Sequence, residues 1–120
     1  MALTAEEILA SDDLGLLKIT VREWKDSEGK PGVVFVRVMS VKERDSYERM
    51  WIGKKDTGVE NFRTQYLAKM LCNEKGELLF APDMVEKLSQ KSGAVMGRIF
   101  DKALAHNNMT EADVEELGKG

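Results

Sequence analysis

The segment from residue 61 to residue 88 constrains the fold more than any other, because one helical pattern stops there at a polar turn and another soon begins. The first pattern is an apolar set at helical spacing: Phe62, Tyr66, Leu67, Met70 and Leu71. The polar run 73–76 ends that helix, and Gly76 supplies the positive φ that a tight turn requires. Residues 77–80 are predicted to be a brief extended segment, and Pro82 allows a second helix to start.

Upstream of this segment, the sequence alternates apolar and polar residues at the period of a half-buried strand. Leu17, Ile19 and Val21 alternate with polar side chains and predict a first strand. Residues 26–32 hold two Gly and one Pro and predict a long polar hairpin loop. Residues 33–39 then predict the returning strand. This strand has apolar residues on both faces, so we expect a helix or a partner subunit to cover its second face.

Hydroxyl residues followed by a carboxylate three positions later mark two helix starts. Thr4 with Glu7 predicts a short N-terminal helix, and Ser40 with Glu43 predicts a second one. After Ser92 the longest helix is predicted. Its apolar stripe is Val95, Met96, Ile99, Phe100, Ala103 and Leu104.

Length and apolar content limit the chain to one core. With 120 residues, of which 42% are hydrophobic, there is little room for a second domain. We predict a single domain over residues 1–120, with a β-hairpin region at 16–40 and a helical region at 41–117 that closes with a short acidic helix. The predicted fold class is α+β, a small antiparallel β-hairpin packed with about four to five α-helices.

Few residues are suited to chemistry. His106 is the sole histidine and is predicted to be structural, because a catalytic triad or metal site needs partners that no second His or Cys supplies. Cys72 is the sole cysteine and is predicted to pack as a small apolar residue. No Gly-rich turn leads a Lys-Ser or Lys-Thr pair into a helix. We therefore predict no catalytic residue, cofactor or metal. A small enzyme that uses only carboxylates is the least favoured class of function.

The charge balance does not favour nucleic acid as a partner. Asp and Glu total 21 against 18 Lys and Arg, a net charge of −3. Basic and aromatic residues do mix between Lys42 and Arg63, as in single-strand binding surfaces. However, Arg44 and Glu48 are four apart and are expected to pair along a helix. No segment approaches membrane-spanning length, the N-terminus does not resemble a signal peptide, and the single cysteine indicates the cytoplasm.

Several sequence runs together resemble the tail assembly chaperones of long-tailed bacteriophages. The first four are VREW at 21–24, VFVRVMSVKERDSYE at 34–48, NFR at 61–63 and NEKGELLF at 73–80. The resemblance continues through PDMVEKLSQKS at 82–92 and HNNMTEADVEEL at 106–117, so it covers nearly the whole chain. Only the loop at 26–32 departs from the tighter turn of such proteins.

The resemblance implies a non-enzymatic assembly factor. Such a protein binds the long, helical tape-measure protein and helps bring tail-tube subunits to it in the host cytoplasm, without entering the mature virion. The family commonly makes a longer product by ribosomal slippage, and Gly118 followed by Lys119 is compatible with a slippery codon run. Self-association is also implied, and a free strand edge beside residues 33–39 is predicted to serve a homo-oligomer.

Partner-binding residues are predicted where aromatic and methionine side chains resemble adaptable interfaces. The candidates are Trp24, Met50, Trp51 and Phe62. Core packing is a competing interpretation for each of them, and the sequence leaves both open. An alternative function also stays open: a small cellular oligomeric adaptor without catalytic activity, whose gene would lie outside a tail-assembly cluster.

Overall fold

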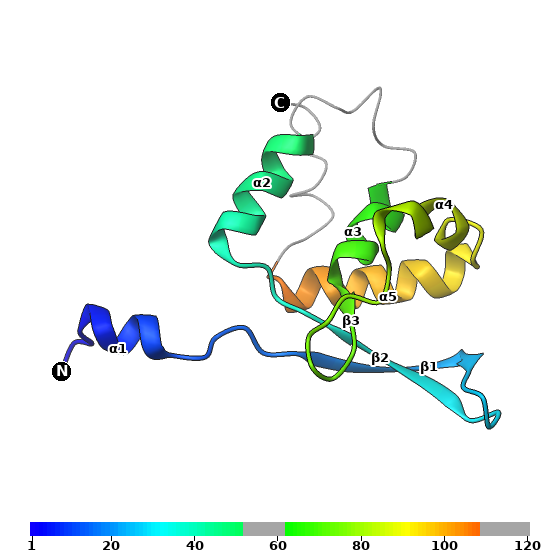
Figure 1. The fold of residues 1–120 in the computed structure, drawn as a ribbon, viewed down its shortest axis with the longest axis horizontal. Coiled ribbons are helices and arrows are strands. Elements are labelled where there is room, and N and C mark those ends of the chain that lie inside the picture. Colours follow the sequence, from blue (N-terminus) through cyan, green and yellow to red (C-terminus); the bar gives the residue numbers. More distant parts are fainter. Residues whose placement is uncertain (52–61, 109–120) are drawn as a thin grey trace.

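The computed structural model describes residues 1–51 and 62–108, and within them the fold is α+β as predicted (Figure 1). The elements are α1 (Ala5–Ala10), β1 (Leu17–Lys25), β2 (Pro31–Val36), α2 (Val41–Trp51), α3 (Phe62–Met70), β3 (Leu71–Cys72), the 3-10 helix η1 (Pro82–Met84), α4 (Val85–Leu88) and α5 (Gly93–His106). The strands form one antiparallel sheet in the order β1-β2-β3. The acidic helix predicted over residues 110–117 lies outside the described residues.

Local hydrogen bonds confirm the predicted helix starts. The Thr4 hydroxyl accepts a bond from the Glu7 amide at 3.2 Å, and the Glu7 carboxylate accepts one from the Thr4 amide at 2.9 Å. Ser40 and Glu43 make the same reciprocal pair ahead of α2. The Ser92 hydroxyl caps α5 by accepting from the amide of Val95 at 3.3 Å. These caps satisfy amides that would otherwise lack partners within the helix.

β2 is the central strand of the sheet, and this overturns two predictions. The strand covers Pro31–Val36 rather than 33–39, because beyond the bond from the Arg37 amide to the Met70 carbonyl, at 3.0 Å, the Met39 amide donates to the side chain of Asn107 instead of to a strand. β3 pairs with β2 at Phe35 and Val36. The free edge predicted beside residues 33–39 is therefore occupied at these two positions, and β1 has the long outer edge of the sheet.

The third strand was not predicted from the sequence. Leu71 continues the apolar spacing of α3, so its helical assignment was natural, but it lies in β3. The extended segment expected at 77–80 contributes only an isolated bridge between Leu78 and Cys72. The intervening turn is as predicted, with Gly76 at φ 82°.

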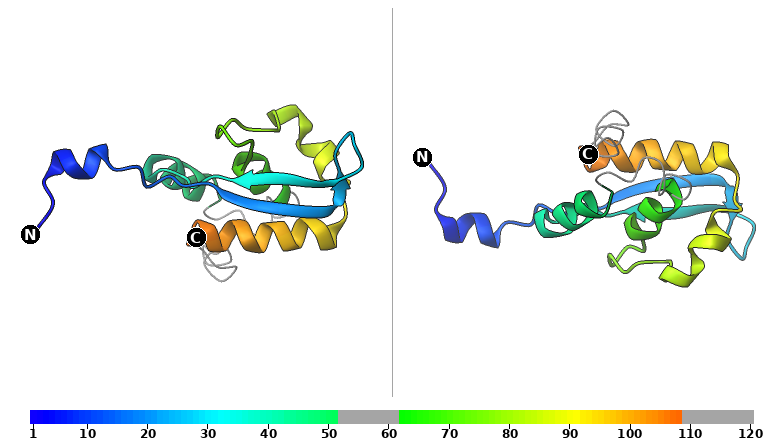
Figure 2. Two further views of the ribbon diagram at one scale, coloured as in Figure 1. Left: turned by 90° about the horizontal axis from the view of Figure 1, so that it is seen from below. Right: turned by 90° about the horizontal axis from the view of Figure 1, so that it is seen from above.

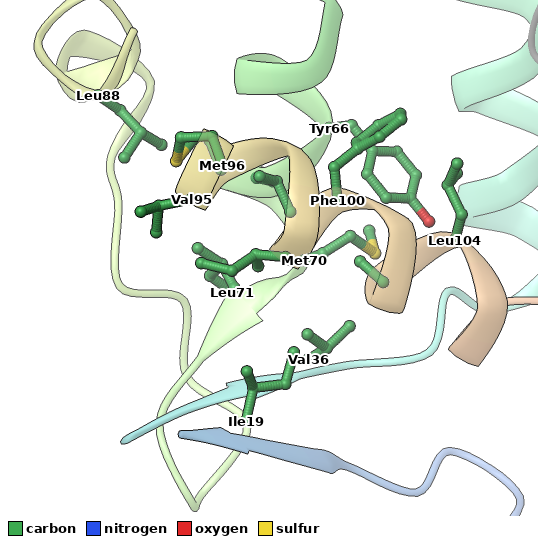
Figure 3. Close-up of a cluster of buried hydrophobic side chains, with 14 of the residues drawn as sticks. Ile19, Val36, Tyr66, Met70, Leu71, Leu88, Val95, Met96, Phe100 and Leu104 are labelled. Atoms are coloured by element: carbon green, nitrogen blue, oxygen red, sulfur yellow. The ribbon is translucent and has the colours of Figure 1, made fainter. Parts of the chain in front are cut away.

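The core lies between one face of the sheet and the helices. All six residues of the predicted α5 stripe are buried, and they meet the inward-facing strand residues Ile19 and Val36 (Figure 3). The helices α2 to α5 lie on one side of the hairpin (Figure 1). On the opposite face Val33 is 45% exposed and Phe35 is half-buried, so no described helix covers Val33, and a cover supplied by a partner subunit stays a prediction.

The N-terminal arm, residues 1–16, projects away from this core. It comprises α1 and an extended stretch, and every one of its residues is exposed. Figures 1 and 2 show the arm leaving the body of the domain along its long axis. The arm therefore contributes nothing to the core.

Gly32 and Gly97 provide a matched pair of glycine substitutions. A Cβ at Gly32 would lie 2.6 Å from the carbonyl oxygen of Trp24, whereas one at Gly97 in α5 would meet nothing within 4 Å. We expect Gly32→Ala to lower the free energy of unfolding by about 1–3 kcal/mol through the clash with a neighbouring strand. Gly97→Ala should raise it by about 0.5–1 kcal/mol, because alanine favours a helix interior. Urea denaturation of both variants checks this, and an unaltered Gly32→Ala would contradict the close approach of the strands.

Candidate partner-binding surfaces

The two residues with the most reactive side chains are held in structural roles. Cys72 is fully buried, with its Sγ 3.5 Å from the carbonyl oxygen of Phe35, and burial raises the pKa of the thiol. It packs as a small apolar residue, as predicted. His106 ends α5, and its Nε2 lies 2.8 Å from the carbonyl oxygen of Gly15. Both side chains thus contact backbone carbonyl groups of the domain.

Within residues 1–51 and 62–108, no group of three or more His, Cys, Asp and Glu side chains is placed to hold a metal ion. Tyr47 and Tyr66 are buried against each other, with ring centroids 5.3 Å apart, and burial raises the pKa of both phenols. No helix in the described part of the chain is long and apolar enough to cross a membrane.

Of the four candidate partner-binding residues, the structure describes the surroundings of one. Trp24 is half-buried near the end of β1 and packs against the core. The helical backbones of Met50 and Trp51 end α2, and Phe62 begins α3, but their side chains lie outside the described structure. Their role in partner binding stays a prediction.

A groove lies on the described surface between β1 and α5 and is here called the β1–α5 groove. It is lined by Leu17, Lys18, Ile19, Thr20, Arg22, Glu23, Arg98, Lys102, Ala105 and His106. Four of these side chains are Lys or Arg and one is a carboxylate, so the groove is basic although the chain is acidic. Its position along a strand edge suits an extended or helical segment of another chain.

One ion pair joins the two walls of the groove. The two Nη atoms of Arg98 donate to the two carboxylate oxygens of Glu23, at 2.7 and 3.0 Å. The guanidinium of Arg98 thereby lowers the pKa of Glu23 from 4.5 to about 2. Both side chains are exposed, and solvent therefore weakens the pair. The pair links α5 to β1 across the groove.

Acid is expected to release this link. Because the pKa of Glu23 is lower in the folded chain than its ordinary value of 4.5, the pair stabilises the fold fully above about pH 4.5 and stops doing so as the pH falls toward 2. Wild-type protein should lose more stability between pH 6 and pH 3 than Glu23→Gln, measured by urea denaturation at both pH values. Arg98→Gln should behave like Glu23→Gln. An equal loss in all three proteins would contradict the assignment.

Asn107 is a structural residue that sequence reasoning missed. It is only 5% exposed, and its Oδ1 accepts a hydrogen bond from the Met39 amide at 2.8 Å. Its Nδ2 donates to the carbonyls of Arg37 at 3.0 Å and Ala103 at 3.1 Å. The side chain thus ties the end of α5 to the segment that joins β2 to α2. The only sequence signal was that asparagine often follows a helix end.

The predicted pairing of Arg44 with Glu48 on α2 is confirmed. Arg44 Nε lies 3.3 Å from Glu48 Oε1, one helical turn away. Arg44 also donates to the backbone carbonyl of Asn107 at 3.2 Å. This arginine is therefore paired within the domain.

The arrangement defines a class: a small α+β domain with helices over one face of a three-stranded antiparallel sheet. No family model matches the sequence, and no curated protein matches it. Among solved structures, the bacteriophage HK97 tail assembly chaperone superposes on 88% of this chain and 94% of its own, with a TM-score of 0.52 and 20% identity. The chain therefore has the fold of a phage tail assembly chaperone, as the sequence resemblance implied.

Proposed function

We propose that the chain is a non-enzymatic phage tail assembly chaperone that binds the tape-measure protein and helps to recruit tail-tube subunits. The observation that carries this proposal is the shared fold with the HK97 tail assembly chaperone over most of both chains. The resemblance of the sequence runs to the same family supports it independently. The expected place of action is the cytoplasm of the host, with no copy retained in the mature virion and with a longer frameshifted form as a second product.

The surfaces of the domain suit the capture of a long helical protein. A chaperone for such a partner has to offer apolar contact area to faces that would otherwise aggregate. Outside the N-terminal arm and the β1–α5 groove, the described surface offers the exposed apolar side chains of Val33, Val41, Leu78, Leu79 and Met84. An amphipathic helix that lays its apolar face on such a surface is a common mode of recognition. We therefore place contacts with the tape-measure protein on the outside of the domain.

The predicted partner-binding residues can be tested by alanine substitution. Trp51→Ala and Phe62→Ala are each expected to weaken capture of the tape-measure protein about tenfold, the cost of losing one aromatic anchor at an interface. Titration of labelled protein in a binding assay measures this. The thermal melting temperature of each variant must stay close to that of the wild type. Undiminished capture by variants that fold normally would remove these two residues from the interface.

Gene context tests the function as a whole. We expect the DNA across codons 117 to 120 to hold a slippery run with an overlapping reading frame, followed by a long frame that encodes a helical protein. Sequencing this region, with mass spectrometry of the expressed products for the longer form, gives the answer. A plain stop codon with neighbours unrelated to tail assembly would contradict the proposal.

A further inference from the structure

The N-terminal arm exposes apolar surface that nothing in the structure covers. Its large apolar side chains are Met1, Leu3, Ile8, Leu9, Leu14 and Leu16, and all six are exposed. Within α1, Ile8 is 56% and Leu9 85% exposed. A helix of six residues is too short to be stable in water without packing. The arm is therefore expected to lie against another surface when the protein works.

The charge of the arm indicates which surface the arm contacts. The arm has four carboxylates, Glu6, Glu7, Asp12 and Asp13, and no Lys or Arg, so its side-chain charge is −4. The β1–α5 groove has four cationic side chains and Glu23, a side-chain charge of +3. Both surfaces also have apolar residues, which in the groove are Leu17, Ile19 and Ala105. The two surfaces are thus complementary in charge and in apolar character.

The geometry favours the groove of a second copy. The root of the arm is held at one end of its own groove, where His106 contacts Gly15, and the arm runs away from there (Figures 1 and 2). The six helical residues and six extended ones reach about 30 Å. This reach matches a groove that follows residues 17–23 of a strand, about 23 Å. The arm of a neighbouring molecule can therefore run the length of the groove without any rearrangement of the domain.

We propose that the N-terminal arm of one copy docks in the β1–α5 groove of a second copy, and that the second copy returns the same contact. A reciprocal exchange of this kind closes a two-fold dimer from one type of contact. The carboxylates of the arm face Lys18, Arg22 and Lys102, while its apolar residues cover the apolar floor. This inference rests on the proposed function in one respect, the self-association that such a chaperone needs, and it names the surfaces involved.

A charge-exchange experiment with the full chain tests the docking. One variant reverses the arm with Glu6→Lys, Asp12→Lys and Asp13→Lys, from −4 to +2, and another reverses the groove with Lys18→Glu and Lys102→Glu, from +3 to −1. All five side chains are exposed, so both variants should fold, which circular dichroism checks. Each variant alone should self-associate at least about tenfold more weakly than the wild type, because attraction becomes repulsion. An equimolar mixture should restore dimers, since each reversed surface meets its complement only in the other molecule.

Sedimentation equilibrium measures these masses, and a matched control removes the effect of net charge. Glu28→Lys with Glu74→Lys and Glu86→Lys makes the same change in charge as the arm variant at exposed positions outside both surfaces, and should leave self-association unchanged. A monomeric wild type, unaffected variants, or a mixture that stays monomeric would each overturn the inference. Capture of the tape-measure protein by such a monomer would show that the docking alone has failed. A chain that passes the exchange test without capturing that protein would overturn the proposed partner instead.

Discussion

Replacing Asn107 with alanine is expected to lower the free energy of unfolding by about 3 kcal/mol. The change leaves the Met39 amide and the Arg37 carbonyl without the partners that Asn107 gives them in a buried place. A buried polar group that loses its hydrogen bond keeps the full cost of leaving water. Urea denaturation followed by circular dichroism measures the loss.

A second amide on the same part of the chain provides the control. Gln90 is exposed, and Gln90→Ala should change the free energy of unfolding by no more than about 0.5 kcal/mol. Asn107→Asp separates the two functions of the side chain, because it keeps an acceptor for the Met39 amide but places a carboxylate against the Arg37 and Ala103 carbonyls. If Asn107→Ala were as mild as Gln90→Ala, the described hydrogen bonds would not stabilise the junction of α5 with α2.

Ile99→Ala is expected to cost about 3–4 kcal/mol, because it opens a cavity at the centre of the core. Ile99 is 0% exposed on the face of α5 that packs on the sheet and α3. Ile8→Ala removes the same atoms from a side chain of the arm that is 56% exposed. It should leave the free energy of unfolding within about 0.5 kcal/mol of the wild type. Thermal and urea unfolding of both variants at low protein concentration, where dimers contribute least, makes this comparison.

The two isoleucines also connect stability with assembly. Ile8→Ala should weaken self-association although it does not affect the isolated domain, because Ile8 belongs to the arm that docks on a second copy. A large loss of domain stability in Ile8→Ala would show that the arm packs on its own core. A mild Ile99→Ala would show that the core is not organised around α5.

The parts of the fold that depend on nearby residues could be predicted from the sequence. The caps at Thr4 and Ser40 are short-range hydrogen bonds, and the α5 stripe follows from helical spacing alone. β3 could not be predicted in this way. Leu71 is buried in either a helix or a strand, and only the backbone of β2, over 30 residues away in the chain, decides between them. A pattern of neighbouring residues carries no information about that distant strand.

The candidate binding surfaces could be predicted from the sequence less well than the fold. The β1–α5 groove is basic only because folding brings Lys18 and Arg22 beside Lys102 and Arg98, which are distant in the chain. The Glu23–Arg98 pair that joins its walls spans 75 positions of sequence. By contrast, the acidic residues of the arm can be read from the sequence. Their availability for contact with another surface depends on the position of the arm outside the core, which only the structure gives. Trp24 packs against the core, which is one of its two interpretations, and its role in partner binding stays a prediction.

Co-expression with the tape-measure protein from the same genome tests the central claim most directly. The chain and the tape-measure protein would be produced together, and the soluble fraction analysed by size-exclusion chromatography with light scattering. We expect the tape-measure protein to be soluble only with this chain, and to elute with several copies of it in a complex of defined mass. A tape-measure protein that aggregates equally with this chain and with an unrelated acidic protein of similar size would contradict the assignment as a tail assembly chaperone.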